Sequence, residues 1–170
     1  HGGGKRINNK LSELNIKSNF IKGLRITDDK TISIVENVLI EFNKEIVNAL
    51  KDKSCKAKRF TSKEYSIISV KRESEELGFV GIPTKIKINV LNEIIKSNEV
   101  PVIAPLGIDE NNQTYNINAD TAAGTIAKKL KARRLLIISD VDGVLDEDKK
   151  LITEINSKKA KEMIIKDTIS

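Results

Sequence analysis

Apolar side chains recur every three or four residues over two early stretches, which predicts two amphipathic helices. The first covers about residues 5–14, directly after a run of glycines. The second starts at Thr27, a residue type that can cap a helix, and runs to about Leu50. Its apolar stripe is wide enough to pack against a sheet or against a second copy of itself. The stripe consists of Ile32, Val35, Leu39, Phe42, Ile46 and Leu50.

The pattern changes between residues 58 and 88, where short β-branched runs partly alternate with polar residues. The runs at 65–70 and 85–88 predict small strands or a hairpin at the edge of the fold, with Gly78, Gly81 and Pro83 between them. A short helix over residues 90–97 follows, with Asn89 as its candidate N-cap.

Two compact apolar runs, at residues 100–106 and 134–139, predict buried strands. An alanine-rich helix is expected between them, over residues 120–132, and a last helix over residues 157–166. A strand, a loop, a helix and a second strand in this order form a βαβ unit. The sequence therefore predicts an α/β fold, with a parallel sheet that carries helices on its faces.

Composition narrows the class of protein. Of the 170 residues, 39% are hydrophobic and 32% are charged, as in globular proteins, and no apolar run approaches the roughly 20 residues that cross a bilayer. The first residues lack the pattern of a signal peptide, and one cysteine, Cys55, excludes an internal disulfide. A reducing, cytoplasmic location is expected.

The net charge of +6 raises the question of a nucleic-acid partner. Lysines are spread along the whole chain among Asp and Glu, and aromatic residues make up only 4%. No basic stretch is interleaved with aromatic residues that could stack on bases. The lysines are therefore interpreted as solvated faces that also attract small anionic ligands.

Two motifs near the start of the chain are suited to binding anions. Gly2-Gly3-Gly4 precedes a predicted helix, so that backbone N–H groups can approach carboxylate or phosphate oxygens, although a tag remnant has the same composition. Arg25 follows a loop glycine, Gly23, just before the next helix. Its guanidinium can clamp a carboxylate with two parallel hydrogen bonds, and the alternative is an ordinary surface arginine.

A third motif, Asn116-Ile117-Asn118-Ala119-Asp120, lies between a predicted buried strand and a helix. Its alternating polar side chains can point in one direction, and ligands bind at this edge of open α/β sheets. The alternative is turn and cap chemistry with Asp120 as N-cap, which does not require two preceding asparagines.

A fourth motif follows the second apolar run and reads Ser139-Asp140-Val141-Asp142-Gly143-Val144-Leu145. It is similar to the opening motif of haloacid-dehalogenase-type phosphatases, in which the first aspartate is the nucleophile and the aspartate two residues later is the acid. Residues 146–170 offer no convincing later strand with paired aspartates, as such a phosphatase requires. The other interpretation is a turn that holds a nucleotide.

Together, the motifs resemble the acetylglutamate kinases of the amino-acid kinase family in order and spacing, over essentially all 170 residues. Two further segments take part in this resemblance, Leu77-Gly78-Phe79-Val80-Gly81 and Pro101-Val102-Ile103-Ala104-Pro105-Leu106-Gly107. The Gly-Leu-Arg-x-Thr and Asn-x-Asn-Ala-Asp motifs point to the acetylglutamate branch in particular.

The resemblance implies a three-layer α/β/α sandwich with a mainly parallel central sheet, in one domain over residues 1–170. Residues 1–115 would form the acid-substrate lobe, and residues 116–170 the start of the nucleotide-binding lobe. The implied reaction transfers the γ-phosphoryl group of ATP to the γ-carboxylate of N-acetyl-L-glutamate, in arginine biosynthesis. Mg²⁺ would be bound through the nucleotide phosphates, and the second helix would pair with its copy in a homodimer or larger homo-oligomer.

The resemblance also implies a role for each motif. Gly3 and Gly4 would hold the substrate near the phosphoryl group, while Arg25 would bind its α-carboxylate. Asp120 would organise catalytic lysines. Asn116 and Asn118 would belong to the substrate site, and the nucleotide pocket would be lined by Asp140, Val141, Asp142, Gly143, Val144 and Leu145.

The sequence departs from the family pattern in three places. The family begins with a strand carrying Lys-x-Gly-Gly and continues to a Gly-Gly-Met segment with a second lysine, and neither is present in these residues. Thr61-Ser62-Lys63-Glu64 stands where relatives tend to have a Gly-rich stretch. The chain is therefore expected to be an internal piece with little activity alone, and an inactive ligand-binding remnant or a sibling kinase stays an alternative.

Overall fold

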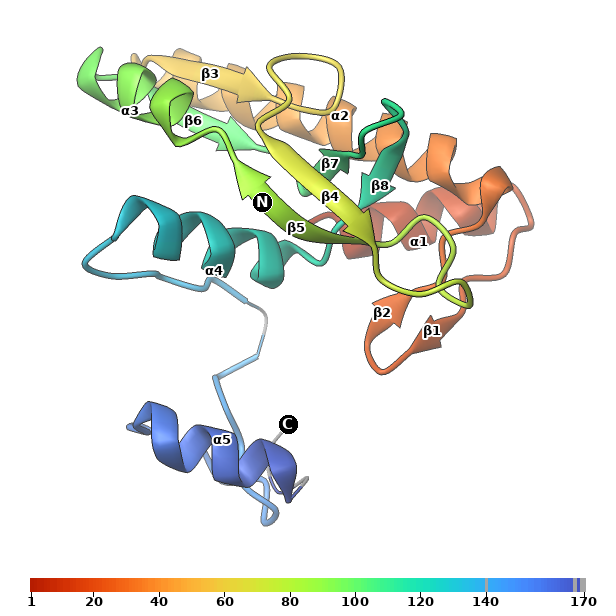
Figure 1. Ribbon diagram of the computed structural model, residues 1–170, viewed down its shortest axis with the longest axis vertical. Helices are drawn as coiled ribbons and strands as arrows, with labels where there is room; N and C mark the ends of the chain where they lie inside the picture. Colours follow the sequence, from red (N-terminus) through yellow and green to blue (C-terminus); the bar gives the residue numbers. More distant parts are fainter. Residues whose placement is uncertain (140, 167, 169–170) are drawn as a thin grey trace. The chain divides into compact units, whose positions relative to one another are not determined.

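The computed structural model describes residues 1–139, 141–166 and 168 (Figure 1). The chain divides into two units, His1–Leu135 and Leu136–Ser170, and each is described by itself. The first unit contains four helices among the described residues: α1 (Gly4–Glu13), α2 (Asp29–Asp52), α3 (Ile88–Lys96) and α4 (Ala119–Leu130). All four confirm predicted helices, with shifts of a few residues at their ends.

The helix caps differ from those predicted. Asp28, not Thr27, caps α2, because its Oδ1 accepts the Thr31 N–H at 2.9 Å. Asn89 lies inside α3, whose N-cap is Lys87 without a side-chain cap bond. Thr27 lies before α2 and does not cap it. Its side chain is fully buried and makes other contacts.

The strands form three sheets. A short hairpin joins β1 (Phe20–Ile21) to β2 (Leu24–Arg25). A parallel pair joins β3 (Ala57–Phe60) to β6 (Val100–Ile103). A mixed four-stranded sheet has the order β5 (Gly81–Ile86), β4 (Ile68–Arg72), β7 (Leu106–Ile108) and β8 (Thr114–Asn116). The predicted edge hairpin is confirmed as the antiparallel β4–β5 pair, although its bounds differ.

The apolar run 100–106 is not one strand, as predicted, but two. Ala104 and Pro105 separate β6 from β7, and the chain changes sheets between them. Proline has no backbone N–H to donate to a ladder, which favours a break at this point. After β7 the chain turns back and forms β8 as an antiparallel neighbour. The predicted βαβ unit is not formed among the described residues, because residues 134–139 do not supply its second strand.

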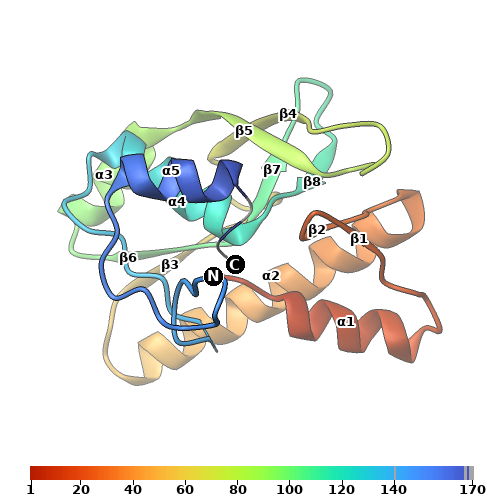
Figure 2. The same cartoon turned by 90° about the horizontal axis from the view of Figure 1, so that it is seen from below.

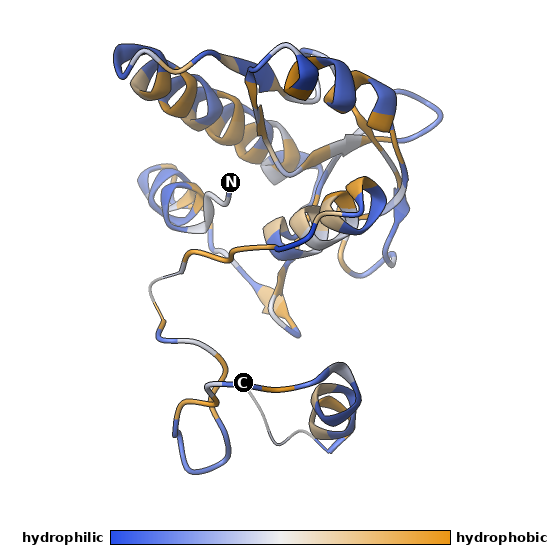
Figure 3. Ribbon diagram, turned by 90° about the vertical axis from the view of Figure 1, so that its left-hand side faces the viewer, coloured by the Kyte–Doolittle hydropathy of each residue, from blue (hydrophilic) through white to orange (hydrophobic). Residues whose placement is uncertain are grey.

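The β3–β6 pair lies between two layers of helices (Figure 2). On one side α2 packs against it through Val47, which joins Ala57 and Val102 in one apolar cluster. On the other side Leu91 of α3 and Ala122 of α4 share a core with Phe60, confirming an α/β arrangement with helices on both faces. Figure 3 shows the matching division of the long helix α2 into an apolar and a polar side.

Residues 134–139 do not form the predicted buried strand. Leu136 is 81% exposed and Ile138 is 95% exposed. A strand requires a neighbour for its hydrogen bonds, and none of the described residues pairs with this run. The apolar composition of this run was therefore not sufficient to predict a buried strand.

The second unit carries α5 (Ser157–Ile165), which confirms the last predicted helix. Asn156 caps it by accepting the Lys159 N–H at 2.9 Å. Upstream, Leu145 and Leu151 form an isolated antiparallel bridge. In the described part of the chain, no helix is both long and apolar enough to cross a bilayer.

Candidate functional site

A pocket of about 190 Å³ in the first unit brings together three of the four motifs. Gly3 and Gly4 line it at the start of α1, Arg25 lines it from the β1–β2 hairpin, and Asn116 and Asn118 line it from the end of β8. These groups lie far apart in the sequence. The structure thus brings the glycine run, Arg25 and the two asparagines to one hollow, and their roles in binding stay predictions.

The glycine run brings the backbone of α1 to this pocket. Gly3 is the N-cap of α1 without a side-chain cap bond, so the first N–H groups of the helix are not used by a cap. A Cβ atom on Gly3 would lie 2.6 Å from Cδ2 of Leu39, so a larger residue would require the Leu39 side chain on α2 to move. The run therefore combines close approach with a helix start that favours anionic groups.

Arg25 is held from several sides by neutral groups. Its side chain donates to Asn8 Oδ1 at 2.8 Å, to Ser18 Oγ, and to the Gly4 carbonyl at 3.3 Å. The guanidinium carbon also lies 4.7 Å from the centre of the Phe20 ring. These contacts fix the direction in which the guanidinium points.

The charge of Arg25 is not neutralised by the described residues, because none of them places a carboxylate within 4.0 Å of it. The residue is only 7% exposed, and this burial lowers the pKa of its guanidinium from the ordinary value. An arginine stays protonated near neutral pH despite such a shift. A buried cation with only neutral partners, on the wall of a pocket, is suited to an incoming carboxylate.

The turn of the β1–β2 hairpin explains the glycine before this arginine. Lys22 and Gly23 both have positive φ angles, of 47° and 77°. Two consecutive residues with positive φ are typical of the tight hairpin turn that matches the twist of the strands, and glycine adopts this conformation without strain. The turn sets Arg25 in register opposite Phe20.

Asn116 reaches Arg25 through a buried threonine. Its Nδ2 donates to Thr27 Oγ1 at 3.3 Å, and Thr27 Oγ1 donates to the Arg25 carbonyl at 3.0 Å. The backbone N–H of Asn116 donates to the Phe79 carbonyl at 2.9 Å. The Asn116 amide is thus linked through Thr27 to the backbone of Arg25, while the guanidinium is held by its own partners, Asn8, Ser18 and Gly4.

The segment around Gly78, which belongs to the family resemblance, encloses a residue of the Arg25 motif. The Thr27 N–H donates to the Leu77 carbonyl at 3.0 Å, and the Phe79 N–H donates to the Thr27 carbonyl at 2.6 Å. Gly78 has φ of 68°, and a Cβ there would lie 2.4 Å from the Thr27 carbonyl oxygen. Glycine at this position allows the chain to enclose Thr27.

The N-cap of α4 is Asn118 and not Asp120, which the alternative interpretation of this motif had as the cap. Asn118 Oδ1 accepts the Thr121 N–H at 2.9 Å. Asn118 also lines the pocket, so the cap and the pocket wall are one residue. Asp120 is exposed in the first turn of α4 and is not among the described residues that line the pocket. Its catalytic role stays a prediction.

The fourth motif belongs to the second unit. Asp140 lies outside the described residues. Val141, Asp142 and Val144 are exposed, and Gly143 has φ of 145°, with a Cβ there 2.9 Å from Cδ1 of Leu151. The role of residues 140–145 in nucleotide binding stays a prediction. Among the described residues, no three His, Cys, Asp or Glu side chains form a group that could hold a metal ion.

Comparison with known proteins identifies the family. The model of the amino acid kinase family matches residues 1–170. The chain belongs to the amino acid kinase family. The predicted resemblance and fold class are confirmed by this match, and the phosphatase interpretation of Asp140 and Asp142 loses its support.

Two curated members of the family are similar to the chain over its whole length. It is 70% identical over 170 residues to the acetylglutamate kinase of Pelagibacter ubique (strain HTCC1062), of which it covers 59%. It is 43% identical over 184 aligned residues to the acetylglutamate kinase of Rhodopseudomonas palustris (strain BisB18), of which it covers 62%. The chain thus spans about 60% of the length of these relatives.

Solved structures agree on the fold. The structure of smu.665 from Streptococcus mutans UA159 superposes with a TM-score of 0.91 at 28% identity, over 98% of this chain and 69% of that one. The N-acetylglutamate synthase from Neisseria gonorrhoeae, in its complex with coenzyme A and N-acetyl-glutamate, superposes with a TM-score of 0.81 at 17% identity. That alignment covers 95% of this chain and 38% of the synthase, and it shows a shared fold alone.

Proposed function

We infer that this chain is part of an acetylglutamate kinase, which phosphorylates the γ-carboxylate of N-acetyl-L-glutamate with ATP, and that its first unit carries the acid-binding site. The observation that carries the proposal is the buried Arg25 on the pocket wall, held by neutral groups and not paired with a carboxylate among the described residues. The curated relatives that are 70% and 43% identical bear the name acetylglutamate kinase, which supports the same substrate.

Arg25 would bind the α-carboxylate of the substrate with two parallel hydrogen bonds. Asn116 and Asn118, which also line the pocket, would contact its polar atoms. The γ-carboxylate would then face the glycine run at the start of α1. In this pose the two ends of a dicarboxylic acid are recognised by different groups, a guanidinium at one end and backbone N–H groups at the other.

In the reaction, a γ-carboxylate oxygen would attack the γ-phosphorus of ATP, and the bond from that phosphorus to the ADP oxygen would break. The products would be ADP and N-acetyl-γ-glutamyl phosphate. Such a transfer depends on alignment and on neutralised charge more than on covalent catalysis. The N–H groups at Gly3 and Gly4 would stabilise oxygens that carry the developing charge.

ATP would carry Mg²⁺ on its phosphates, as in other enzymes in which magnesium is held mainly by the substrate. Residues 140–145 would contact the nucleotide, and Asp120 would position catalytic lysines. Residues 1–115 would be the acid-substrate lobe, and residues 116–170 would begin the nucleotide lobe. The product would enter arginine biosynthesis in the cytoplasm, and α2 would pair with its copy in a homodimer or larger homo-oligomer.

A phosphotransfer assay tests the proposal on protein expressed from the complete open reading frame. ADP formation is measured with N-acetyl-L-glutamate, and hydroxylamine traps the acyl phosphate. Aspartate, glutamate, carbamate and a nucleoside monophosphate serve as the substrates of sibling kinases. Turnover that is specific to N-acetyl-L-glutamate supports the proposal, whereas faster turnover of another acceptor contradicts it. Ligand binding without turnover would favour the inactive remnant.

A further inference from the structure

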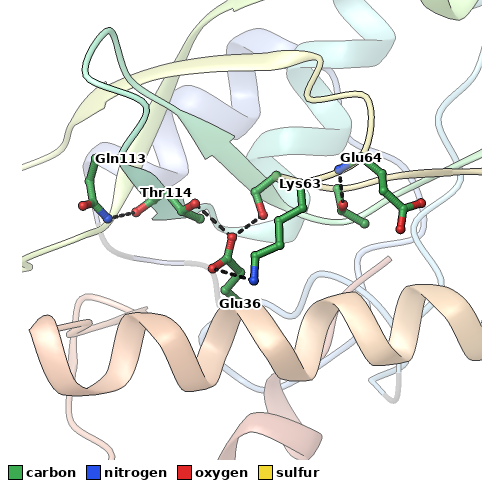
Figure 4. A network of polar contacts seen from close by, with 7 residues as sticks. Glu36, Lys63, Glu64, Gln113 and Thr114 are labelled. Atoms are coloured by element: carbon green, nitrogen blue, oxygen red, sulfur yellow. Dashed lines mark hydrogen bonds and ion pairs between the residues drawn. The ribbon is translucent and has the colours of Figure 1, made fainter.

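Glu36 is a carboxylate on α2 that is nearly enclosed and that the site described above does not use. Its side chain is 14% exposed, on a helix whose other glutamates are more open. A carboxylate in such a place needs compensating donors, because removing it from water is costly. The structure supplies three donors, and they come from two segments far from α2 in the sequence (Figure 4).

One oxygen of Glu36 binds two hydroxyl groups. Oε1 accepts from Ser62 Oγ at 2.5 Å and from Thr114 Oγ1 at 2.9 Å. The other oxygen, Oε2, lies 3.8 Å from Nζ of Lys63, which is 62% exposed. The two hydroxyl bonds are therefore the enclosed part of the network, and the ion pair is its outer part, where water screens the charge.

Thr114 connects this network to the pocket. It lies two residues before Asn116 on β8, so both side chains point to the same face of the strand. Tyr115, between them, points the other way into the core. Thr114 binds Glu36 on α2, and Asn116 binds Thr27 just before α2. The three-residue strand β8 is thus tied by side chains at two points, to Glu36 on α2 and to Thr27 just before α2.

Ser62 belongs to the loop after β3, which is also fixed. Thr61 and Ser62 are both buried. The Thr61 N–H donates to the Glu64 carbonyl at 2.8 Å, and the Glu64 N–H donates to Thr61 Oγ1 at 2.9 Å, which closes the loop on itself. Glu36 therefore joins a closed loop and the strand that carries Asn116 to one helix.

We propose that Glu36 is a positioning residue for substrate binding: through Thr114 it sets the place of β8, and with it the place of the Asn116 amide in the pocket. Glu36 is not among the described residues that line the pocket. In this proposal Oε1 of Glu36 acts as a hydrogen-bond acceptor, and the negative charge of the carboxylate is not required. The expected change in KM rests on the proposed function. The effect of Glu36 on β8 does not, because it can be measured without enzyme activity.

The variants are Glu36→Ala, Glu36→Gln, Thr114→Val and the double variant Glu36→Ala with Thr114→Val. Glutamine keeps an oxygen that can accept both hydroxyls, while valine keeps the shape of threonine without its hydroxyl. Glu41→Ala is the matched control, because Glu41 is exposed on the same helix. Kinetics are measured with protein from the complete open reading frame at saturating ATP.

Glu36→Ala and Thr114→Val are expected to raise the KM for N-acetyl-L-glutamate about fivefold, the size of one lost net hydrogen bond, with kcat changed less than about twofold. Glu36→Gln should restore a KM close to that of the wild type. The double variant should be no worse than Glu36→Ala, because both changes remove the same contact. Wild-type KM values in both single variants, or additive effects, would overturn the proposal.

Hydrogen exchange over residues 114–116 separates this proposal from the proposed function. Glu36→Ala and Thr114→Val should speed exchange there, whereas Glu36→Gln and Glu41→Ala should not. Unchanged exchange in Thr114→Val overturns the proposal even if Glu36→Ala fails to fold. A wild-type protein that does not phosphorylate N-acetyl-L-glutamate would refute the function alone, and the exchange measurement would still decide the role of Glu36.

Discussion

The two units of the chain differ in how the described residues of their motifs are arranged: in the first unit several motifs line one pocket, whereas in the second unit residues 141–144 are exposed. In His1–Leu135, Arg25, Thr27 and Asn116 are linked by hydrogen bonds and rest on a buried core. In Leu136–Ser170, the apolar residues Val141 and Ile165 are 64% and 84% exposed, and α5 has no buried residue. A motif becomes a binding site where buried elements fix its side chains.

The largest effect on substrate binding is expected at Arg25, the buried arginine of the first unit. Arg25→Ala should raise the KM for N-acetyl-L-glutamate by roughly 100-fold, and Arg25→Lys by roughly 10-fold, because an ammonium cannot reproduce two parallel hydrogen bonds. Steady-state kinetics of both variants check this. Arg6→Lys is the control, since Arg6 is a more exposed arginine on α1 paired with Glu45. An unchanged KM in Arg25→Lys would contradict the proposal that Arg25 binds the α-carboxylate with two parallel hydrogen bonds.

The next effect concerns the glycine that encloses Thr27. Gly78→Ala should lower the free energy of unfolding by about 1–3 kcal/mol, because alanine is strained at this positive φ and its Cβ meets the Thr27 carbonyl. Denaturant titration measures the change. Gly124→Ala is the control, since nothing lies within 4 Å of a Cβ there and alanine suits the interior of α4. That control should gain about 0.5–1 kcal/mol. Equal behaviour of the two variants would contradict the close packing at Gly78.

A smaller effect is expected at the start of α2. Asp28→Ala should cost about 0.5–2 kcal/mol of unfolding free energy through loss of the N-cap, and Asp28→Asn much less. A hydrogen bond from the Thr31 side chain lowers the pKa of Asp28 below its ordinary 3.8. The ionised cap therefore stabilises the fold fully above that ordinary value, and the stabilisation disappears as the pH falls through the lowered pKa.

Denaturant titrations of wild type and Asp28→Ala across pH 2–6 test this sign, in a range set by the ordinary pKa of aspartate. The difference between the two proteins should shrink toward the acid end. A difference that grows as the pH falls would mean that the cap does not act through its ionised form.

The smallest effect is expected in the second unit. Asp142 is exposed, and substitutions at such positions usually change the free energy of unfolding by less than about 0.5 kcal/mol. Asp142→Asn should stay within this range, and neither it nor the wild type should hydrolyse a generic phosphate ester. Thermal unfolding and a colorimetric phosphatase assay check both points. Hydrolysis that Asp142→Asn abolishes would revive the phosphatase interpretation.

The sequence predicted the helices of the first unit well, because periodic apolar stripes are local signals, although the predicted caps of α2 and α3 were wrong. It failed where the outcome depends on a distant partner. Residues 134–139 have the composition of a buried strand, yet none of the described residues pairs with them. Pro105 marks a local break between β6 and β7, but local composition does not encode that the two strands join different sheets.

The site shows the same limit. The glycine run, Arg25 and Asn116 could be chosen because their residue types suit anions and carboxylates. Asn8 and Ser18 could not, because common polar residues acquire a role only when the fold brings them together. Thr27 was predicted as a helix cap, and its bond to Asn116 appears only in the structure. Glu36 had no local signal either, since its hydroxyl donors are 26 and 78 residues away in the chain.

Calorimetric binding of two ligands tests the central claim most directly: N-acetyl-L-glutamate and its α-amide, each titrated into wild type and Arg25→Ala from the complete open reading frame. The wild type should prefer the α-carboxylate by roughly 10-fold to 100-fold, because only a carboxylate accepts two charge-assisted hydrogen bonds from the buried guanidinium. Arg25→Ala should bind the two ligands equally. A preference that survives in Arg25→Ala would contradict the account, because the α-carboxylate would then be recognised elsewhere.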